Sequence, residues 1–114
     1  MGVSIFTPRV GDWSPWGTIE TVRIEAIGIA FVSTSSHGGF WLAPCRIAEM
    51  SEAERAYADR WSRCPGGQWW EEDCASAYVV RRFADQIAES YDQTAEALRD
   101  SAAGLIAAFE RRAA

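Results

Sequence analysis

Lysine is absent from the sequence, so all 11 basic residues are arginines, and histidine occurs only once. No apolar run approaches the roughly 20 residues of a membrane-spanning helix, which argues against a helical membrane protein. The N-terminus has no basic segment followed by an apolar one, so we expect no signal peptide. The three cysteines cannot all pair with one another, and we expect free thiols and a cytoplasmic location.

The chain is acidic, with 16 acidic residues and a formal net charge of −5. Only Asp12, Glu20 and Glu25 precede residue 45, so the acidic surplus lies in the second part of the sequence. An acidic chain repels phosphate at long range, which disfavours direct binding of nucleic acid. It suits a basic protein partner, including a nucleic-acid-binding protein, although the same charge is ordinary for solubility.

The length of 114 residues fits a single domain with one core, and 48% of the residues are hydrophobic. Pro8, Gly11, Pro15 and Gly17 predict an irregular segment over residues 1–17. Residues 18–44 read as a β-meander and residues 45–114 as mainly helical. The predicted fold class is α+β, with a three-stranded antiparallel meander packed against two to three helices and a long C-terminal helix.

The strands are predicted from alternation and from β-branched residues. In the first strand, Arg23 and Glu25 alternate with apolar residues, so we expect these two charged side chains to face solvent. The apolar residues expected on its buried face are Val22, Ile24 and Ala26. The three predicted strands span residues 18–26, 29–34 and 40–43.

Ser51 and Glu54 have the spacing of a capping box, which predicts a helix that starts here and that Pro65-Gly66-Gly67 ends. Its expected buried stripe consists of Ala53, Ala56, Tyr57 and Trp61. The carboxylates Glu71, Glu72 and Asp73 fit the first turn of a second helix, where negative charge complements the helix dipole.

The C-terminal segment has apolar residues in steps of four and three, which predicts a helix. A second capping box, Ser90 with Gln93, predicts a break near residues 85–90. One continuous helix from about residue 72 is the alternative. The apolar residues form a stripe that could pack within the chain or against a second copy, which would give a homodimer. The residues of this stripe are Ile87, Tyr91, Ala95, Leu98, Ala102, Leu105 and Phe109.

The stretch from Trp69 to Cys74 joins two large aromatic side chains, three carboxylates and a thiol. A small enzyme could use His37, Cys74 and Glu72, because a helix N-terminus favours a thiolate. The neighbouring carboxylates oppose that thiolate, and no known nucleophile signature surrounds it. We therefore expect a non-enzymatic protein and keep catalysis as an alternative.

The chain has the three cysteines and one histidine that a Cys₃His zinc site needs: His37, Cys45, Cys64 and Cys74. However, no two of the cysteines form a C-x₂-C pair. Three adjacent carboxylates on a helix would point in different directions and could not converge on one ion. We therefore expect no metal ion and no other cofactor, with a structural zinc module as an alternative. A purely architectural role for His37 is a hydrogen bond to the carboxylate segment, with Gly38 and Gly39 permitting close approach.

Three short segments carry a resemblance to a known family: Ser14-Pro15-Trp16-Gly17, Ser36-His37-Gly38-Gly39 and Trp70-Glu71-Glu72-Asp73-Cys74. In this order they resemble the DUF7007 domains of bacterial, plasmid and phage proteins. The resemblance covers roughly residues 13–84 and brings no assigned activity. It implies a setting in mobile genetic elements, where small acidic proteins often inhibit host defence.

From this we expect a non-enzymatic protein-binding inhibitor or accessory protein, of the anti-CRISPR or another counter-defence kind. It would occlude a basic, nucleic-acid-binding surface of a protein partner with carboxylates and an exposed tryptophan. We expect no direct contact with nucleic acid or with a membrane. The residues expected to bind are Trp69, Trp70, Glu71, Glu72, Asp73, Asp92, Glu96 and Asp100.

Overall fold

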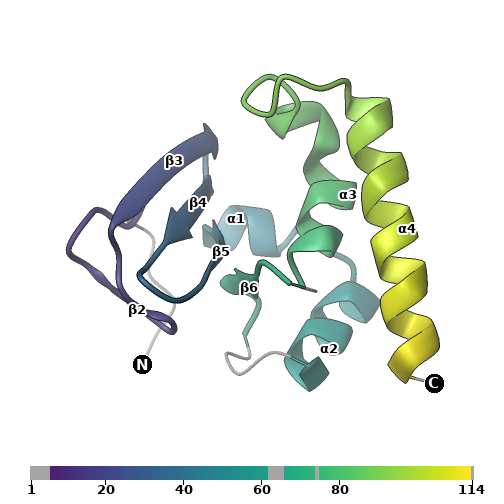
Figure 1. Cartoon of the computed structure of the whole chain (residues 1–114), viewed down its shortest axis with the longest axis horizontal. Helices are drawn as coiled ribbons and strands as arrows, with labels where there is room; N and C mark the ends of the chain where they lie inside the picture. Colours follow the sequence, from purple (N-terminus) through teal and green to yellow (C-terminus); the bar gives the residue numbers. More distant parts are fainter. Residues whose placement is uncertain (1–5, 62–65, 74, 114) are drawn as a thin grey trace.

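A computed structural model of the chain describes residues 6–61, 66–73 and 75–113. Within these ranges it leaves out the side chains of Tyr57, Ala58, Arg60, Trp61 and Ala113. The fold is α+β, as predicted, and α3 lies between a β-sheet and the long C-terminal helix α4 (Figure 1). The helices are α1 (Pro44–Ile47), α2 (Glu52–Trp61), α3 (Ser76–Ile87) and α4 (Ala95–Ala113).

The main sheet has four antiparallel strands in the order β3-β4-β5-β6. The strands are β3 (Thr21–Ala26), β4 (Ile29–Ser33), β5 (Gly38–Leu42) and β6 (Trp69–Glu71). The first three form the predicted meander. The fourth strand ends at Glu71, where we expected the first turn of a helix, and that prediction is wrong because Glu71, Glu72 and Asp73 lie in the strand and the turn after it. Pairing with β5, a partner distant in sequence, extends this segment, and α3 begins only at Ser76.

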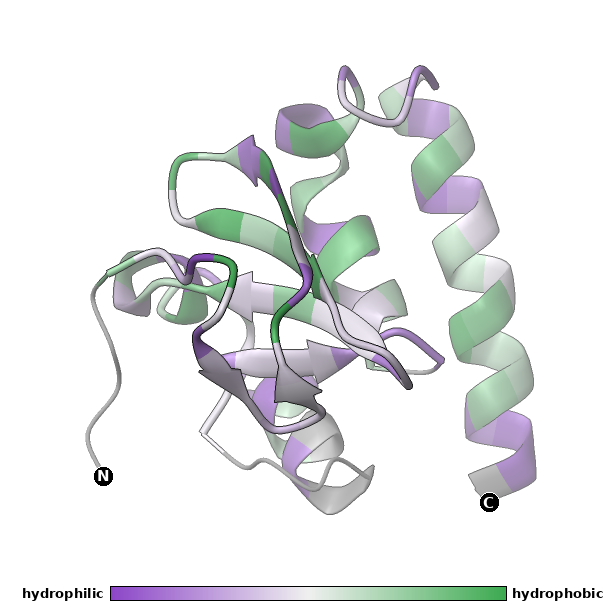
Figure 2. Cartoon of the chain, turned by 60° about the vertical axis from the view of Figure 1, so that its left-hand side comes forward, coloured by the Kyte–Doolittle hydropathy of each residue, from purple (hydrophilic) through white to green (hydrophobic). Residues whose placement is uncertain are grey.

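A small hairpin precedes the sheet, formed by β1 (Trp13–Ser14) and β2 (Gly17–Thr18). The prediction of an irregular segment up to residue 17 is therefore wrong at these residues. The buried hydroxyl of Ser14 accepts the N–H of Trp16 at 3.2 Å and donates to the carbonyl of Gly17 at 2.7 Å. Figure 2 shows this hairpin in front of the sheet, with α3 behind it.

The main core lies between the sheet and the helices α3 and α4. It includes Phe40 and Trp70 from the sheet, Phe83 from α3 and Ile106 from α4. A second, smaller hydrophobic cluster is formed by Ala30, Trp41 and Ala43. Val22 and Trp69 are partly buried and pack against it. The sheet is thus covered on two sides, which explains why every residue of β5 is buried.

The expected exposure of β3 is reversed at two positions. Glu25 is buried, whereas Ile24 is 58% exposed. The Glu25 carboxylate accepts hydrogen bonds from Arg23 and from Ser90 in the loop that joins α3 to α4. These partners satisfy the buried charge, which an apolar neighbour could not do. A register shift between Ile24 and Ala26 adds an irregularity that alternation alone does not reveal.

The capping box of α2 is confirmed. The Ser51 N–H donates to the Glu54 carboxylate at 2.8 Å, and the Glu54 N–H donates to the Ser51 hydroxyl at 3.0 Å. The expected buried stripe is wrong at Ala53 and Ala56, which are exposed. Its other two members, Tyr57 and Trp61, have side chains outside the described part of the chain.

The predicted break in the C-terminal helical region is confirmed, and one continuous helix is wrong. The hydroxyl of Thr94 accepts the N–H of Ala97 at 3.0 Å and caps α4, while Ser90 binds Glu25 instead of capping a helix. The buried stripe of α4 also ends differently from our expectation. Ile106 is buried and Leu105 is 63% exposed.

Among the helices of the described residues, α4 included, none has the combination of length and apolar character that a bilayer crossing requires.

Candidate functional site

The candidate site lies at the β5–β6 end of the sheet, where the N-terminal hairpin meets these two strands. Gly39 pairs with Glu71 in the antiparallel register, and the N–H of Glu72 donates to the carbonyl of Gly38 at 3.0 Å. His37 immediately precedes β5, and Asp73 lies two residues beyond Glu71. The pairing therefore brings the only histidine beside the carboxylate stretch.

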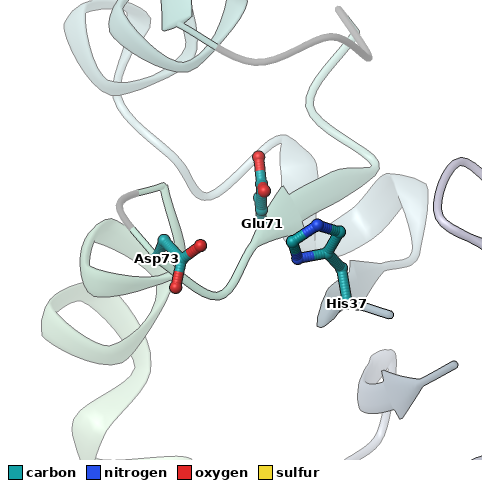
Figure 3. Close-up of side chains that lie close together, drawn as sticks. All are labelled: His37, Glu71 and Asp73. Atoms are coloured by element: carbon teal, nitrogen blue, oxygen red, sulfur yellow. The ribbon is translucent and has the colours of Figure 1, made fainter. Parts of the chain in front are cut away.

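His37, Glu71 and Asp73 form a compact cluster. One possible ligand atom from each residue lies within 4.8 Å of the corresponding atom of the other two. Figure 3 shows His37 entering from the start of β5, Glu71 from β6 and Asp73 from the turn after it. The expected divergence of the carboxylates presupposes a helix. Here Glu71 ends β6 and Asp73 lies in the turn after it, and in this arrangement the two carboxylates converge.

The turn before β5 positions His37. The backbone N–H of Thr34 donates to the carbonyl of His37 at 2.8 Å. The Thr34 hydroxyl in turn accepts the His37 N–H at 3.2 Å. The Ser36 hydroxyl then donates to the carbonyl of Trp16 at 3.4 Å, which ties this turn to the N-terminal hairpin. The backbone of His37 is therefore held by local hydrogen bonds, and its side chain is exposed.

Three tryptophans form the aromatic part of the site. Trp13 and Trp16 both meet Trp69 edge to face, with ring centroids 6.2 and 5.7 Å apart. Such pairs contribute about 0.5–1.5 kcal/mol beyond their buried area. Trp69 is partly buried, whereas Trp13 is 66% exposed. The hairpin thus presents an apolar ring beside the carboxylates.

Glycine at position 39 is required by the close approach of its neighbours. A Cβ at this position would lie 2.2 Å from the carbonyl oxygen of Trp70 and 2.6 Å from the ring of Trp16. Both distances are far below van der Waals contact. Gly39 therefore permits the hairpin and β6 to pack together against β5, and the expectation of close approach at this glycine pair is confirmed.

A pocket adjoins the histidine–carboxylate cluster. Its lining residues are Pro15, Trp16, His37 and Glu71. The pocket thus combines an apolar wall with an imidazole and a carboxylate. Such a lining suits a ligand with an aliphatic or planar body and a positively charged end.

Among the described residues, the carboxylates of the site lack the arginine partners that the buried carboxylates have. Glu54 accepts hydrogen bonds from Arg81 and Arg82 at 3.3 and 2.8 Å. Burial alone would raise the pKa of Glu54, but the Ser51 N–H and these two arginines outweigh it, and its pKa is lowered. By contrast, no ion pair with Glu71 or Asp73 is present among the side chains that the structure describes.

The second buried carboxylate, Glu25, belongs to a network at the other end of the sheet. Arg23 donates to Glu25 and lies over the rings of Phe31 and Tyr91 at 5.5 and 4.9 Å. The hydrogen bond to Glu25 raises the pKa of Arg23 against the opposing effect of burial. Burial, and then the charge of Glu25, raises the pKa of Tyr91. This network fixes the loop before α4 to β3.

The residues expected to bind do not form one surface. Trp70 is fully buried and its indole N–H donates to the carbonyl of Gly67, so it is a core residue and not an exposed anchor. Glu72 and Asp73 are exposed, and Glu71 is partly so. Asp92 lies in the loop before α4, and Glu96 and Asp100 lie on α4, which is on the far side of α3 from the sheet (Figure 1).

The proposed catalytic group is only partly described. Cys74 and Cys64 lie outside the described residues. His37 clusters with Glu71 and Asp73, whereas Glu72 is not a member of that group. Cys45 is exposed on α1 and is not a member of it either.

Three residues of the site were not expected to take part in function: Trp13, Pro15 and Trp16. In sequence, Trp13 and Trp16 flank Ser14-Pro15, which indicates only a loop that packs across a sheet. The short segment Ser14-Pro15-Trp16-Gly17 was nevertheless one of the three that carry the family resemblance. The structure brings all three of these segments to one place through the hairpin, the turn before β5 and β6.

The comparisons with known proteins give one positive result. The model of a family described as a domain of unknown function (DUF7007) matches residues 9–113, nearly the whole chain. No match is found among curated proteins or among solved structures.

Proposed function

The chain belongs to the family of DUF7007 domains, and from that premise we propose that it is a non-enzymatic protein-binding inhibitor or accessory protein. Its binding surface is the site formed by the N-terminal hairpin, the turn before β5 and the end of β6. We name this the hairpin–β6 surface and define it by Trp13, Trp16, Glu71, Glu72 and Asp73.

The observation that carries this proposal is that the three family segments meet at one place, where Trp13, Glu72 and Asp73 are exposed. Core packing alone explains Trp70, which is fully buried, but not Trp13, which is 66% exposed. Tryptophan is enriched among the residues that dominate binding energy at protein interfaces. The exposed Trp13, which packs against Trp69, and the carboxylates at the end of β6 therefore offer both an apolar anchor and a charge that selects the partner.

The chemistry of the surface favours a basic partner. Arginine guanidinium groups stack on aromatic rings and form paired hydrogen bonds with carboxylates. The pocket of Pro15, Trp16, His37 and Glu71 offers one such ring and one such carboxylate. A partner that presents arginines for nucleic acid would meet complementary charge here, and the bound chain would occlude that surface.

The biological setting of the proposal comes from the resemblance to domains of bacterial, plasmid and phage proteins. We propose that the partner is a nucleic-acid-binding defence complex, such as a CRISPR effector. The chain would act as a decoy of the nucleic-acid backbone, with carboxylates in place of phosphates.

The test is co-elution of the purified chain with a panel of purified defence effectors at low and moderate salt. The proposal predicts a complex with at least one effector that weakens as salt rises, since exposed charges are screened. Trp13→Ala should weaken that complex by about thirtyfold, the effect of losing an anchor of about 2 kcal/mol.

Ile27→Ala is the matched control for Trp13→Ala, because Ile27 is an apolar residue that is 87% exposed but lies in the β3–β4 turn. This variant should bind as the wild type does. Absence of a complex with every effector, or equal weakening by both substitutions, would contradict the proposal.

A further inference from the structure

We propose that His37, Glu71 and Asp73 bind one divalent transition-metal ion of the first row, such as Mn²⁺ or Zn²⁺. This inference concerns the isolated chain and does not depend on the protein-binding function. Its basis is the geometry and chemistry of the three side chains at the end of the β5–β6 pair (Figure 3).

The donor atoms lie somewhat farther apart than the ligands of one bound ion. With metal–nitrogen and metal–oxygen distances of about 2.0–2.2 Å, three ligand atoms of one ion can all be at most about 3.8 Å from one another. The ligand atoms of His37, Glu71 and Asp73 lie within 4.8 Å of one another. A small rotation of side chains that are exposed or partly exposed brings all three into range.

The backbone behind the ligands is already fixed. Glu71 belongs to β6 and is paired with Gly39, while the backbone of His37 is held by Thr34. Glu72 is bonded through its N–H to the carbonyl of Gly38, which fixes the approach to Asp73. The three ligands thus come from two neighbouring segments whose relative position does not depend on the ion. Preorganisation of this kind lowers the cost of binding.

The electrostatics also favour a cation. Glu71 and Asp73 place two like charges side by side, and among the described side chains no arginine forms an ion pair with either. The imidazole of His37 makes no hydrogen bond to any of the side chains that the structure describes, so a ring nitrogen is available. A dication would balance the two carboxylates.

The donor set selects the class of metal. One imidazole with two carboxylates suits borderline ions such as Zn²⁺, Fe²⁺ and Mn²⁺ better than Ca²⁺, which takes six to eight oxygen ligands. Three protein ligands leave coordination positions open. Because His37 and Glu71 also line the pocket with Pro15 and Trp16, an oxygen donor from a ligand in that pocket could complete the coordination.

The test is a calorimetric titration of the purified chain with MnCl₂. Mn²⁺ is the probe because the cysteine thiolates of this chain would compete for Zn²⁺, and thiolates bind Mn²⁺ poorly. The proposal predicts saturable binding of one ion per chain and a melting temperature that rises with Mn²⁺ concentration. His37→Ala, Glu71→Gln and Asp73→Asn should each weaken binding by about tenfold or more.

Glu72→Gln is the matched control, because Glu72 lies between two of the ligands but is not a member of the cluster. It should change the affinity by about twofold at most, as a surface substitution does. Absence of saturable binding to the wild type would overturn the proposal. So would equal weakening by Glu72→Gln, which would indicate general attraction by negative charge, or unchanged affinity in His37→Ala. Partner binding is not measured here, so failure of the metal site and failure of the proposed function are distinguishable.

Discussion

Gly39 is the residue at which the candidate site is most tightly constrained, because β6 and the ring of Trp16 both approach it. Gly39→Ala would place a Cβ 2.2 Å from the backbone of Trp70, which cannot move aside as a flexible side chain could. We expect the substitution to lower the free energy of unfolding by about 1–3 kcal/mol, as overpacking does. Denaturation with urea, followed by circular dichroism, measures this loss.

Gly104→Ala is the control for that prediction. Gly104 lies within α4, and a Cβ there would meet nothing within 4 Å. This substitution should instead stabilise the protein by about 0.5–1 kcal/mol, since alanine loses less conformational freedom than glycine on entering a helix. Equal effects of the two substitutions would contradict the close approach at Gly39.

Glu54 provides a prediction on pH. Its folded-state pKa lies below the ordinary value of 4.5, so its ionised form stabilises the fold above that pH. The contribution is lost as pH falls through the folded-state pKa. Glu54→Gln should therefore lower the free energy of unfolding by about 1–2 kcal/mol at pH 7, a modest loss because Arg81 and Arg82 are about 40% exposed.

The difference between Glu54→Gln and wild type should shrink as pH falls below about 4.5 and the wild-type carboxyl becomes protonated. Thermal denaturation of both proteins across this pH range measures it. Glu52→Gln, an exposed carboxylate of the same helix turn, should cost about 0.5 kcal/mol or less. A pH-independent difference for Glu54→Gln would show that its charge is not the stabilising feature.

At the scale of elements, the beginning of α4 depends on Thr94. Its hydroxyl accepts the N–H of Ala97 at 3.0 Å, and α4 is attached to the rest of the chain mainly through α3. Thr94→Ala should destabilise the protein by about 1 kcal/mol through the loss of this cap. Thr94→Ser, which keeps the acceptor oxygen, should recover most of that loss in the same denaturation experiment. A Thr94→Ala protein as stable as wild type would contradict the cap.

The start of α4 also shows what the sequence can predict about a helix and what it cannot. The apolar period predicted a helix, and the capping box of Ser90 with Gln93 predicted a break between α3 and α4. It could not reveal which residue caps, because Ser90 and Thr94 both have suitable side chains. The choice depends on Glu25, 65 positions from Ser90 in sequence, which binds the Ser90 hydroxyl. A contact of that kind is not encoded in a local pattern.

The strand β6 is the clearest case of a non-local cause. Residues 69–71 contain two tryptophans followed by a carboxylate, a pattern that also fits a strand leading into a helix N-terminus. Hydrogen bonding to β5 decides in favour of a longer extended segment, and Gly39 makes the approach of that partner possible. Because the carboxylates then lie on a strand and a turn, the argument against their convergence no longer applies.

At the scale of the whole molecule, the fold class and the three-stranded meander could be predicted because they follow from local alternation and short connections. The location of the site could not, since its parts lie in the hairpin, the turn before β5 and β6. The short segments that carry the family resemblance did contain most of its residues. What was missing was the topology that places Trp16 against Trp69 and His37 beside Glu71 and Asp73.

This arrangement also places two groups of exposed or partly exposed acidic residues on different elements. Glu71, Glu72 and Asp73 belong to the hairpin–β6 surface, whereas Glu96, Asp100 and Glu110 are exposed on α4. The account assigns binding to the first group. The two groups each contain three carboxylates, so they permit a comparison at equal change of net charge.

The most direct test of the account is the affinity of a co-eluting effector for two triple variants, measured by calorimetry at low salt. One carries arginine in place of Glu71, Glu72 and Asp73, and the other carries arginine in place of the three acidic residues of α4. The account predicts that the first variant binds at least about tenfold more weakly than wild type and the second binds almost normally. Equal weakening of both, or weakening of the α4 variant alone, would contradict it.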